Sequence, residues 1–501
     1  MELLHLKSGT DIRGTAVATE KNPQIQLTDE VVSAITSAFA LFLSKNTGKN
    51  AEDLTVSVGH DSRISAVRIK ESVISALTGT GIRVLYCSYC STPAMFMTTV
   101  TKGCDGAVQI TASHHPFDRN GLKFFTRDGG LSGDEITSIL KSAEKDEALP
   151  QKTCGECREI DYISEYSAIL RDMIIKGVNN GEKPLSGFKI AVDAGNGVGG
   201  FYANQVLAPL GADVSASRYL DFDGTFPNHI PNPENREAMN SIREATLENG
   251  CDLGVIFDTD VDRASCVDEK GEEINRNAIV ALAAAIAIED CPNGTVVTDS
   301  VTSDGLHEFI ETDLKGHHIR FKRGYKNVID EAVRRTDLGE SVPLAIETSG
   351  HAAFKENYYL DDGAYLITKI IIKAARLRCE GKKIGDCISS LKKPLEEKEL
   401  RFNITAPDFR RAGEEIIKRV TQKAEESPLF TPAPDNYEGI RVNINSPECQ
   451  GWFLLRLSVH DPVMPFNCES NVKGGCREIC KRFKSLVSGE QEIDLSPLNF
   501  D

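Results

Sequence analysis

A serine, two imidazoles and a lysine lie close together in residues 106–125, GAVQITASHHPFDRNGLKFF. Ser113 supplies a hydroxyl, and His114 and His115 follow it directly. Asn120-Gly121 favours a turn that sends Lys123 back past the serine. A hydroxyl beside a cation is the combination that phosphate chemistry needs. The alternative for an isolated serine of this kind is a helix cap or a turn.

Three carboxylates at alternate positions, Asp258, Asp260 and Asp262, follow the apolar run Leu253–Phe257, and Arg263 comes next. Like charges at this spacing raise one another's pKa unless a cation holds them. Hard oxygen ligands suit Mg²⁺, which keeps open positions for phosphate oxygens. The pattern therefore predicts a magnesium loop, and a solvated acidic loop is the alternative.

A carboxylate and a hydroxyl lie two residues apart in Glu347-Thr348-Ser349-Gly350-His351. On a turn, Glu347 and Ser349 are able to bind vicinal sugar hydroxyls, with His351 near enough to assist. The alternative is an ordinary turn in which both side chains cap the backbone.

Alternating strands and helices must position these groups. Residues 54–58, 84–86, 107–110, 189–193, 253–257, 295–298 and 343–346 have the apolar composition of buried strands, and residues 29–43, 68–77 and 278–288 have helical periodicity. Repeated βα units favour mostly parallel sheets that carry functional residues at the carboxyl ends of their strands. Residues 436–442 and 451–458 alternate like antiparallel strands.

The length of 501 residues predicts three or four domains. Polar stretches at 143–158 and 381–401 indicate linkers. A net charge of −17 argues against nucleic acid or an anionic membrane as partner. No apolar run approaches the roughly 18 residues of a membrane span, and the amino terminus has no secretion signal. We therefore expect a cytoplasmic protein, or an organelle form whose transit peptide has been removed.

The fourteen cysteines indicate reduced thiols that serve mostly as small apolar groups. Cys87-x-x-Cys90 and Cys154-x-x-Cys157 have the spacing of zinc knuckles. Neither pair has an obvious partner pair nearby, so structural zinc is the minor alternative.

Taken together, the motifs resemble those of the α-D-phosphohexomutase superfamily, which includes the phosphoglucomutase/phosphomannomutase family. The serine stretch matches its Thr-Ala-Ser-His-Asn-Pro and Asn-Gly-x-Lys pattern, with His115 in place of Asn. Residues 258–263 match its Asp-Gly-Asp-x-Asp-Arg loop, with Thr259 in place of Gly. Similar matches occur at 7–14, 59–63, 322–326 and 347–351. The family's terminal phosphate loop keeps Arg456, Ser458 and Pro462, but Val459 and His460 depart from it.

This resemblance implies an α/β fold of four domains around a central cleft. Three α/β domains with mixed or mostly parallel sheets would carry the phosphoserine loop (1–150), the metal loop (151–275) and the sugar-binding loop (276–395). A smaller α+β domain (396–501) would bind phosphate. The resemblance also implies a phosphohexomutase that interconverts hexose 1-phosphate and hexose 6-phosphate of glucose or mannose. The reaction would use a phosphoserine, Mg²⁺ and a hexose 1,6-bisphosphate intermediate. The protein would be a monomer or homodimer.

The resemblance assigns roles residue by residue. The catalytic residues would be Ser113, Lys123, Arg13 and His114. The metal ligands would be Ser113, Asp258, Asp260 and Asp262, with Arg263 beside them. The substrate-binding residues would be Arg323, Gly324, Tyr325, Glu347, Ser349, His351, Arg456, Ser458 and His460. Three other functions stay open: a phosphoglucosamine mutase, a metal-dependent phosphomonoesterase, and a weakened regulatory protein that binds phosphosugars.

Overall fold

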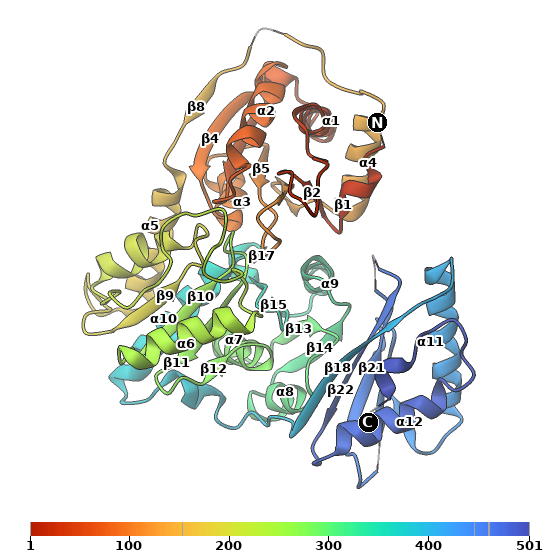
Figure 1. Ribbon diagram of the computed structural model, residues 1–501. Coiled ribbons are helices and arrows are strands. Elements are labelled where there is room, and N and C mark those ends of the chain that lie inside the picture. The colour runs from red at the N-terminus through yellow and green to blue at the C-terminus, as the bar shows by residue number, and fades with distance from the viewer. Residues whose placement is uncertain (1, 153, 445, 459–460, 500–501) are drawn as a thin grey trace. The chain divides into compact units, whose positions relative to one another are not determined.

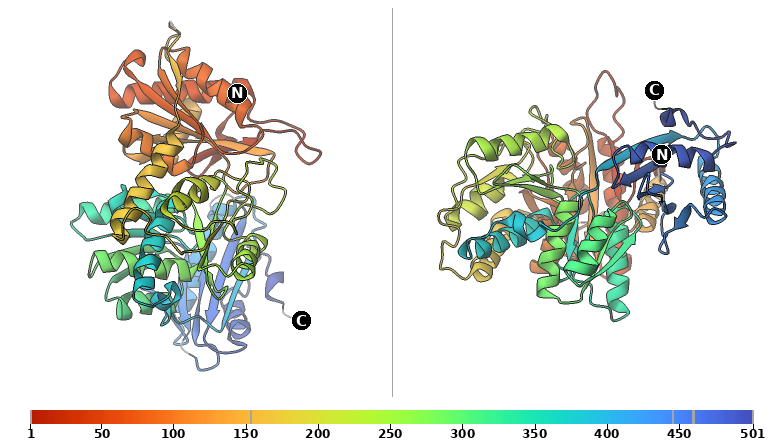
Figure 2. Two further views of the ribbon diagram at one scale, coloured as in Figure 1. Left: turned by 90° about the vertical axis from the view of Figure 1, so that its left-hand side faces the viewer. Right: turned by 90° about the horizontal axis from the view of Figure 1, so that it is seen from below.

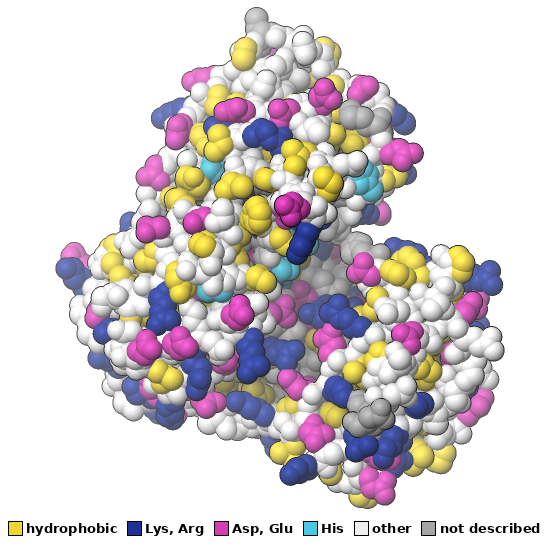
Figure 3. Space-filling model, viewed as in Figure 1, with side chains coloured by type: hydrophobic (Ala, Val, Ile, Leu, Met, Phe, Trp, Pro, Cys, Tyr) yellow, Lys and Arg dark blue, Asp and Glu magenta, His cyan; other side chains and the backbone are white. Residues whose placement is uncertain are grey.

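The computed structural model describes residues 2–152, 154–444, 446–458 and 461–499. The chain forms two compact units, one of residues 1–287 and 349–389 and one of residues 288–348 and 390–501. Figure 1 shows the elements of both. Acidic and basic side chains are interspersed on the face drawn in Figure 3, so no single sign of charge dominates that face.

The first sheet of unit 1 has the strand order β1-β2-β6-β5-β3-β4-β8 and is mixed. β3 is parallel to β4 and β5, whereas β6 is antiparallel to β2 and β5. The strands are β1 (Lys7–Ser8), β2 (Asp11–Thr15), β3 (Thr55–His60), β4 (Arg83–Tyr89), β5 (Gly106–Ile110), β6 (Arg119–Thr126) and β8 (Cys157–Glu159). β8 lies in the stretch predicted as a linker and pairs with β4.

Helices cover both faces of this sheet. α1 (Asp29–Thr47) packs against α2 (Ala66–Thr78) and α4 (Gly133–Glu144) over a core that includes Val56, Val58 and Val108. α3 (Thr92–Thr101) covers the opposite face, where Thr98 contacts Ser57. α1 begins where the Thr28 hydroxyl caps Val31 N. These layers appear in red and orange in Figure 2.

The second sheet of unit 1 has the order β12-β11-β10-β9. β9 (Ile190–Asp193) and β10 (Leu253–Phe257) are parallel, and β10 forms an antiparallel hairpin with β11 (Ala264–Asp268), beyond which lies β12 (Glu273–Ile274). The associated helices are α5 (Tyr162–Val178), α6 (Arg236–Glu248) and α10 (Gly363–Cys379), and α5 packs against α10. A short hairpin of β16 (Ala352–Phe354) and β17 (Leu360–Asp361) completes the unit.

Unit 2 begins within α7 (Asn277–Asp290). Its first layer contains the parallel strands β13 (Thr295–Asp299), β14 (His317–Phe321) and β15 (Leu344–Ile346), with α8 (Asp304–Glu308) and α9 (Tyr325–Asp337). Its second layer is an antiparallel sheet of order β18-β22-β21-β20-β19. The elements are β18 (Glu396–Asn403), β19 (Phe430–Pro432), β20 (Ile440–Ile444), β21 (Gly451–Leu455), β22 (Val463–Ser470), α11 (Phe409–Glu425) and α12 (Gly475–Leu486).

The α11 and α12 helices share one core with this antiparallel sheet, which includes Ile416, Phe453, Phe466 and Phe483. The predicted hinge at 381–401 contains a short 3-10 turn and the start of β18. Three α/β layers followed by a smaller α+β layer confirm the predicted fold class. The residue boundaries of the four domains stay a prediction.

Candidate active site

Ser113 follows the end of β5 and has a left-handed backbone conformation with φ of 50°. This conformation is uncommon for residues other than glycine and persists where the surroundings hold it. Thr111 holds it here, because its hydroxyl accepts from Ser113 N at 2.9 Å and donates to Asp61 at 2.7 Å. The buried Ser113 Oγ donates to Asp258 Oδ2 at 2.8 Å and accepts from Arg263 Nη2 at 2.9 Å.

Arg63 holds the rest of the serine loop. Its guanidinium donates to the carbonyl oxygens of Ser113 (2.5 Å), His115 (2.6 Å), Pro116 (2.7 Å) and Arg119 (2.9 Å). The side chain is fully buried beside Asp61, which lies 3.2 Å from Nε. One buried cation therefore joins four carbonyl oxygens of this loop.

β6 carries Lys123 to the carboxylates, but the predicted turn at Asn120-Gly121 is wrong, because both residues lie within β6 and the chain turns earlier, before Arg119. A Cβ on Gly121 would lie 2.3 Å from Ile12 O and 2.7 Å from Thr111 O, so only glycine fits this approach. The Lys123 ammonium lies 3.2 Å from Asp260 Oδ2 and forms a closer ion pair with Asp262.

The predicted carboxylates lie in the β10–β11 turn and are buried. Donor atoms of Asp258, Asp260 and Asp262 all lie within 4.8 Å of one another. Burial and the charge of Asp262 raise the pKa of Asp258. Burial opposes ionisation of Asp262, but the charges of Lys123 and Arg263 outweigh it and lower its pKa. Val261, between the ligands, has φ of 67°, which is strained for a β-branched residue.

These residues fit a divalent cation. Within the described part of the chain, Asp260 Oδ1 and Asp262 Oδ1 are buried without a hydrogen-bond partner. A buried carboxylate oxygen costs free energy unless a donor or metal satisfies it. All the donors are hard oxygen atoms, which suit Mg²⁺ rather than a thiolate-binding metal.

Arg263 and Arg13 surround these carboxylates with positive charge. Arg263 is buried, and its Nη2 lies 3.0 Å from Asp258 Oδ2. Arg13 pairs with Asp11 at 2.8 Å and lies opposite Gly121 in the β2–β6 ladder.

His114 Nδ1 lies 2.6 Å from Arg263 Nη2 and 3.3 Å from Ser113 Oγ. Burial, followed by the charge of Arg263, lowers the pKa of His114 to about 2. The imidazole is therefore neutral at ordinary pH, and its Nδ1 accepts a hydrogen bond from the Arg263 guanidinium. Its assignment as a proton donor or acceptor in the reaction stays a prediction.

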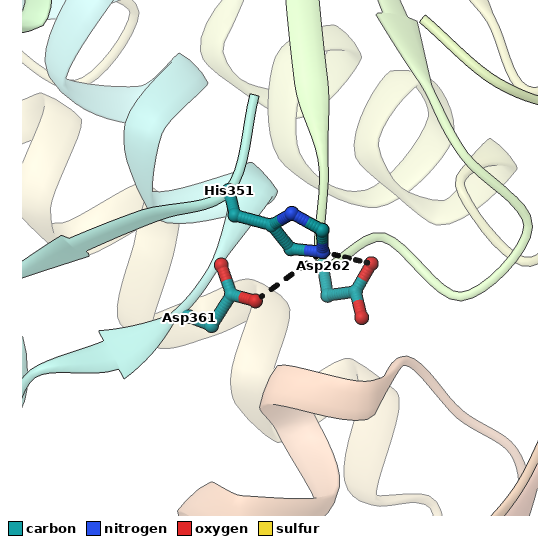
Figure 4. A group of neighbouring side chains, drawn as sticks. All are labelled: Asp262, His351 and Asp361. Atoms are coloured by element: carbon teal, nitrogen blue, oxygen red, sulfur yellow. Dashed lines mark ion pairs between the residues drawn. The ribbon is translucent and has the colours of Figure 1, made fainter. Parts of the chain in front are cut away.

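His351 stands beside the same carboxylates. Its Nδ1 lies 2.9 Å from Ser349 Oγ, and its Nε2 lies 3.8 Å from Asp262 Oδ1 and 3.6 Å from Asp361 Oδ2. Figure 4 shows the imidazole between these two carboxylates. Burial lowers the pKa of His351 to about 3 despite the charge of Asp262. Gly350 allows the turn before His351 to lie directly against Ala264, because a Cβ on residue 350 would be 2.5 Å from Ala264 O.

A second group of predicted residues lies in unit 2 and contains Arg323, Gly324, Tyr325, Glu347 and Arg456. Gly324 N donates to Glu347 Oε1 at 2.6 Å, Arg323 N donates to Glu438 Oε2 at 3.0 Å, and Tyr325 begins α9. Arg456 Nη1 lies 3.6 Å from Glu438 Oε1. Within the described chain, Arg456 Nε is buried without a hydrogen-bond partner.

Ser458 N donates to Val463 O at 2.9 Å, so this residue begins the turn into β22. His460 lies outside the described residues. The roles of Ser458 and His460 in binding phosphate therefore stay predictions.

Several residues of both groups were missed in the sequence analysis. Thr92 donates to Asp260 and begins α3, and Asp299, at the end of β13, accepts from Thr348 at 2.7 Å. Arg63 lies in the turn at 59–63 that resembles the family, but that pattern indicates no role for its side chain. Glu438 contacts Arg323 and Arg456 from a loop more than 100 positions from Arg323. Glu438 lies within the stretch 436–442 that was predicted as a strand, and its position there carries no chemical pattern in the sequence.

The zinc alternative finds no support among the described residues, where the side-chain groups able to hold a metal contain only Asp and His. Cys87 and Cys90 are buried, whereas Cys154 and Cys157 are exposed. In the described chain, no helix combines the length and apolar character that crossing a membrane requires.

Comparison with known proteins gives three matches to one family. The alpha/beta/alpha domains I, II and III of Phosphoglucomutase/phosphomannomutase match residues 6–149, 167–271 and 275–393. A phosphoglucomutase of Neisseria gonorrhoeae is 28% identical over 488 residues, 96% of each chain. A phosphomannomutase/phosphoglucomutase of Pseudomonas aeruginosa is 27% identical, over 86% of this chain and 87% of that protein. The crystal structure of a family protein from Burkholderia thailandensis superposes with a TM-score of 0.78 at 23% identity, covering 96% of this chain and 98% of the other.

Proposed function

Because the chain belongs to the phosphoglucomutase/phosphomannomutase family and is a phosphohexomutase, we propose that Ser113 carries the phosphoryl group that it transfers. The enzyme interconverts hexose 1-phosphate and hexose 6-phosphate. The observation that carries the assignment is the position of Ser113 Oγ, which lies 2.8 Å from Asp258 Oδ2 and 2.9 Å from Arg263 Nη2.

Each half of the proposed reaction moves one phosphoryl group. In the first, the bond from phosphorus to Ser113 Oγ breaks as a sugar hydroxyl oxygen bonds to phosphorus, and the hydroxyl proton passes through a base to Ser113 Oγ. The hexose 1,6-bisphosphate then turns end for end. In the second half, Ser113 Oγ bonds to the other phosphoryl group as the bond from that group to the sugar oxygen breaks. The Oγ proton passes through a base to the sugar oxygen, which leaves the isomeric monophosphate. Catalysis of such a transfer rests on positioning and on charge stabilisation.

The chain's own residues supply both. Arg263 donates to Ser113 Oγ and would keep donating to the oxygens of the phosphoryl group bound there. Lys123 and Arg13 add positive charge beside the same carboxylates. Asp258, Asp260, Asp262 and the phosphorylated Ser113 would hold Mg²⁺, which supplies positive charge to the phosphoryl oxygens when bound.

The remaining residues are assigned to substrate binding. Arg323, Arg456 and Ser458, with His460, would bind the phosphate that is not transferred. Glu347, Ser349 and His351 would bind sugar hydroxyls, with Gly324 and Tyr325 in the neighbouring loop. The uncommitted Nε of Arg456 supports this assignment, because a buried guanidinium donor without a partner suits an incoming anion. The proposed substrates are glucose and mannose phosphates, with glucosamine phosphate as the alternative. A cytoplasmic location and a monomeric or homodimeric state stay predictions.

The test is turnover of purified protein with Mg²⁺ and a trace of hexose 1,6-bisphosphate. Isomer formation and release of inorganic phosphate are measured in the same reaction for glucose, mannose and glucosamine monophosphates. We expect isomer formation to exceed phosphate release by orders of magnitude. Phosphate release alone would identify a phosphomonoesterase, and the absence of both would identify a binding protein.

A further inference from the structure

A long loop of unit 1, residues 219–235, precedes α6 and contains no helix or strand. Loops of this length in compact domains commonly have a function. Tyr219 and Phe226 have φ of 54° and 51°, which is unusual for aromatic residues. Backbone strain of this kind persists only where contacts hold it, and the loop makes such contacts at three points.

His229 makes the first contact. Its Nε2 lies 3.0 Å from Asp193 Oδ1, and its Nδ1 lies 3.0 Å from Ile230 O. Both ring nitrogens face acceptors, so the imidazole is held as a double donor. Asp193, at the end of β9, also accepts from Ser241 Oγ at 2.6 Å and Gly195 N at 2.9 Å. The buried carboxylate thereby joins the loop to β9 and α6.

The second contact is with the arginine of the metal loop. Asn232 Oδ1 accepts from Arg263 Nη1 at 3.1 Å, while Nη2 of the same guanidinium donates to Ser113 Oγ at 2.9 Å. Pro231, next to Asn232, packs so closely on Gly195 that a Cβ there would lie 2.7 Å from the proline Cβ. The side-chain amide of Asn232 therefore holds Nη1 of the guanidinium, while the neighbouring Nη2 contacts the serine.

The third contact is with the arginine that shapes the serine loop. The Phe226 ring lies 5.1 Å from the guanidinium carbon of Arg63. A Cβ on Gly224 would lie 2.3 Å from Ser62 O, so the loop lies directly on the turn that carries Arg63. Loop 219–235 thus contacts both arginines that hold Ser113.

We propose that loop 219–235 positions the phosphoryl-transfer centre, with His229 as its anchor and Asn232 as the residue that orients Arg263 toward Ser113. This inference rests on the proposed role of Ser113. Asn232 and His229 are positioning residues, because they act through Arg263 and do not touch the reacting atoms. Their effect is on transfer rather than on substrate binding, since the charge that Arg263 directs at the phosphoryl group counts most in the transition state.

The test compares Asn232→Ala, Asn232→Asp and His229→Gln with Ile230→Ser, whose side chain is 52% exposed on the same loop. We expect Asn232→Ala to lower kcat by about tenfold and to change KM by less than about threefold, which is the effect of losing one hydrogen bond to a charged group. Asn232→Asp keeps an acceptor for Arg263 and should restore kcat to within about threefold of wild type. His229→Gln should lower kcat less than Asn232→Ala, and Ile230→Ser should leave it unchanged.

Wild-type kcat in Asn232→Ala would overturn the inference, as would a lower melting temperature with unchanged kcat. Equal losses of kcat in Asn232→Ala and Asn232→Asp would also overturn it, because the acceptor would then not matter. If Asn232→Ala does not fold, His229→Gln is the deciding variant: a lower kcat supports the inference, and a wild-type kcat overturns it. Ser113→Ala is assayed in parallel: activity in that variant refutes the proposed function itself, whereas an inactive Ser113→Ala beside an unaffected Asn232→Ala refutes the loop alone.

Discussion

Two arginines, Arg263 of unit 1 and Arg456 of unit 2, lie near carboxylates with 3% and 13% of their side chains exposed, but they differ in how fully they are bonded. Arg263 contacts Asp258, Ser113, His114 and Asn232 within about 3.2 Å. Arg456 forms a looser ion pair with Glu438, at 3.6 Å, among the residues that the structure describes. A saturated guanidinium is held for chemistry, whereas a guanidinium with an uncommitted donor is available to a ligand. The difference predicts that substitutions in unit 1 change kcat and that substitutions around Arg456 change KM.

The largest effect is expected for Ser113→Ala. The hydroxyl is the proposed phosphoryl acceptor, so its loss should lower mutase activity by more than about 10⁴-fold, the range seen when a catalytic nucleophile is removed. Activity is measured as isomer formation, and peptide mass spectrometry should find phosphate on Ser113 in the wild type. Circular dichroism confirms that the variant is folded. Phosphate on another residue would contradict the assignment.

Asp260→Asn comes next. It removes one charge from the carboxylate group and should weaken Mg²⁺ binding, with turnover slowed by about 10²–10³-fold, as is typical for the loss of one electrostatic contact to a transition state. Isothermal titration with Mg²⁺ and the kcat of the variant test this expectation. Wild-type protein in excess chelator should behave similarly. Full activity under chelation would exclude a metal role.

Arg456→Ala should act on binding instead. We expect KM to rise by about ten- to a hundredfold with kcat changed by less than about threefold, since one or two hydrogen bonds to a charged phosphate are lost. Arg411→Ala is the matched control, because Arg411 is 76% exposed and its ion pair with Glu415 contributes little. A fall in kcat with unchanged KM would remove the contrast between the two arginines.

The smallest expected effect is on the free energy of unfolding, and it concerns Glu469, a buried carboxylate of unit 2 that lies outside the metal loop. Burial raises the pKa of Glu469 to about 7, even though Arg441 and Trp452 act in the opposite direction. Its folded pKa exceeds its unfolded value of 4.5, so the native state binds more protons between these values. The free energy of unfolding should therefore fall as pH rises from about 4.5 to about 7, by roughly 1–3 kcal/mol.

Glu469→Gln keeps an acceptor for Trp452 Nε1 and should remove this fall. Urea unfolding of wild type and variant at pH 5 and pH 8 measures it, with the variant more stable than wild type at pH 8 only. An equal difference between the two proteins at both pH values would show that Glu469 does not titrate in this range.

The sequence predicted those residues of the site that lie in short local motifs. Ser113, Lys123 and the three carboxylates lie in short motifs whose spacing has a chemical meaning, and the strands before them are strongly apolar. Contacts between distant segments were missed. Asn232 lies 31 positions from Arg263, and Arg63 lies 50 positions from Ser113. Their side chains acquire a role only when the sheets bring these segments together, which periodicity does not encode. β8 was missed because its residues are polar and exposed at the sheet edge.

The four carbonyl contacts of Arg63 also bear on how the serine loop opens. A single side chain closes residues 113–119 onto the turn at 61–63, so neither segment loosens without releasing the same guanidinium. Amide hydrogens of both segments should then exchange with solvent deuterium in one concerted event, as members of one cooperative unit. Shortening that side chain in Arg63→Lys would separate the event into two, and the serine loop would exchange first.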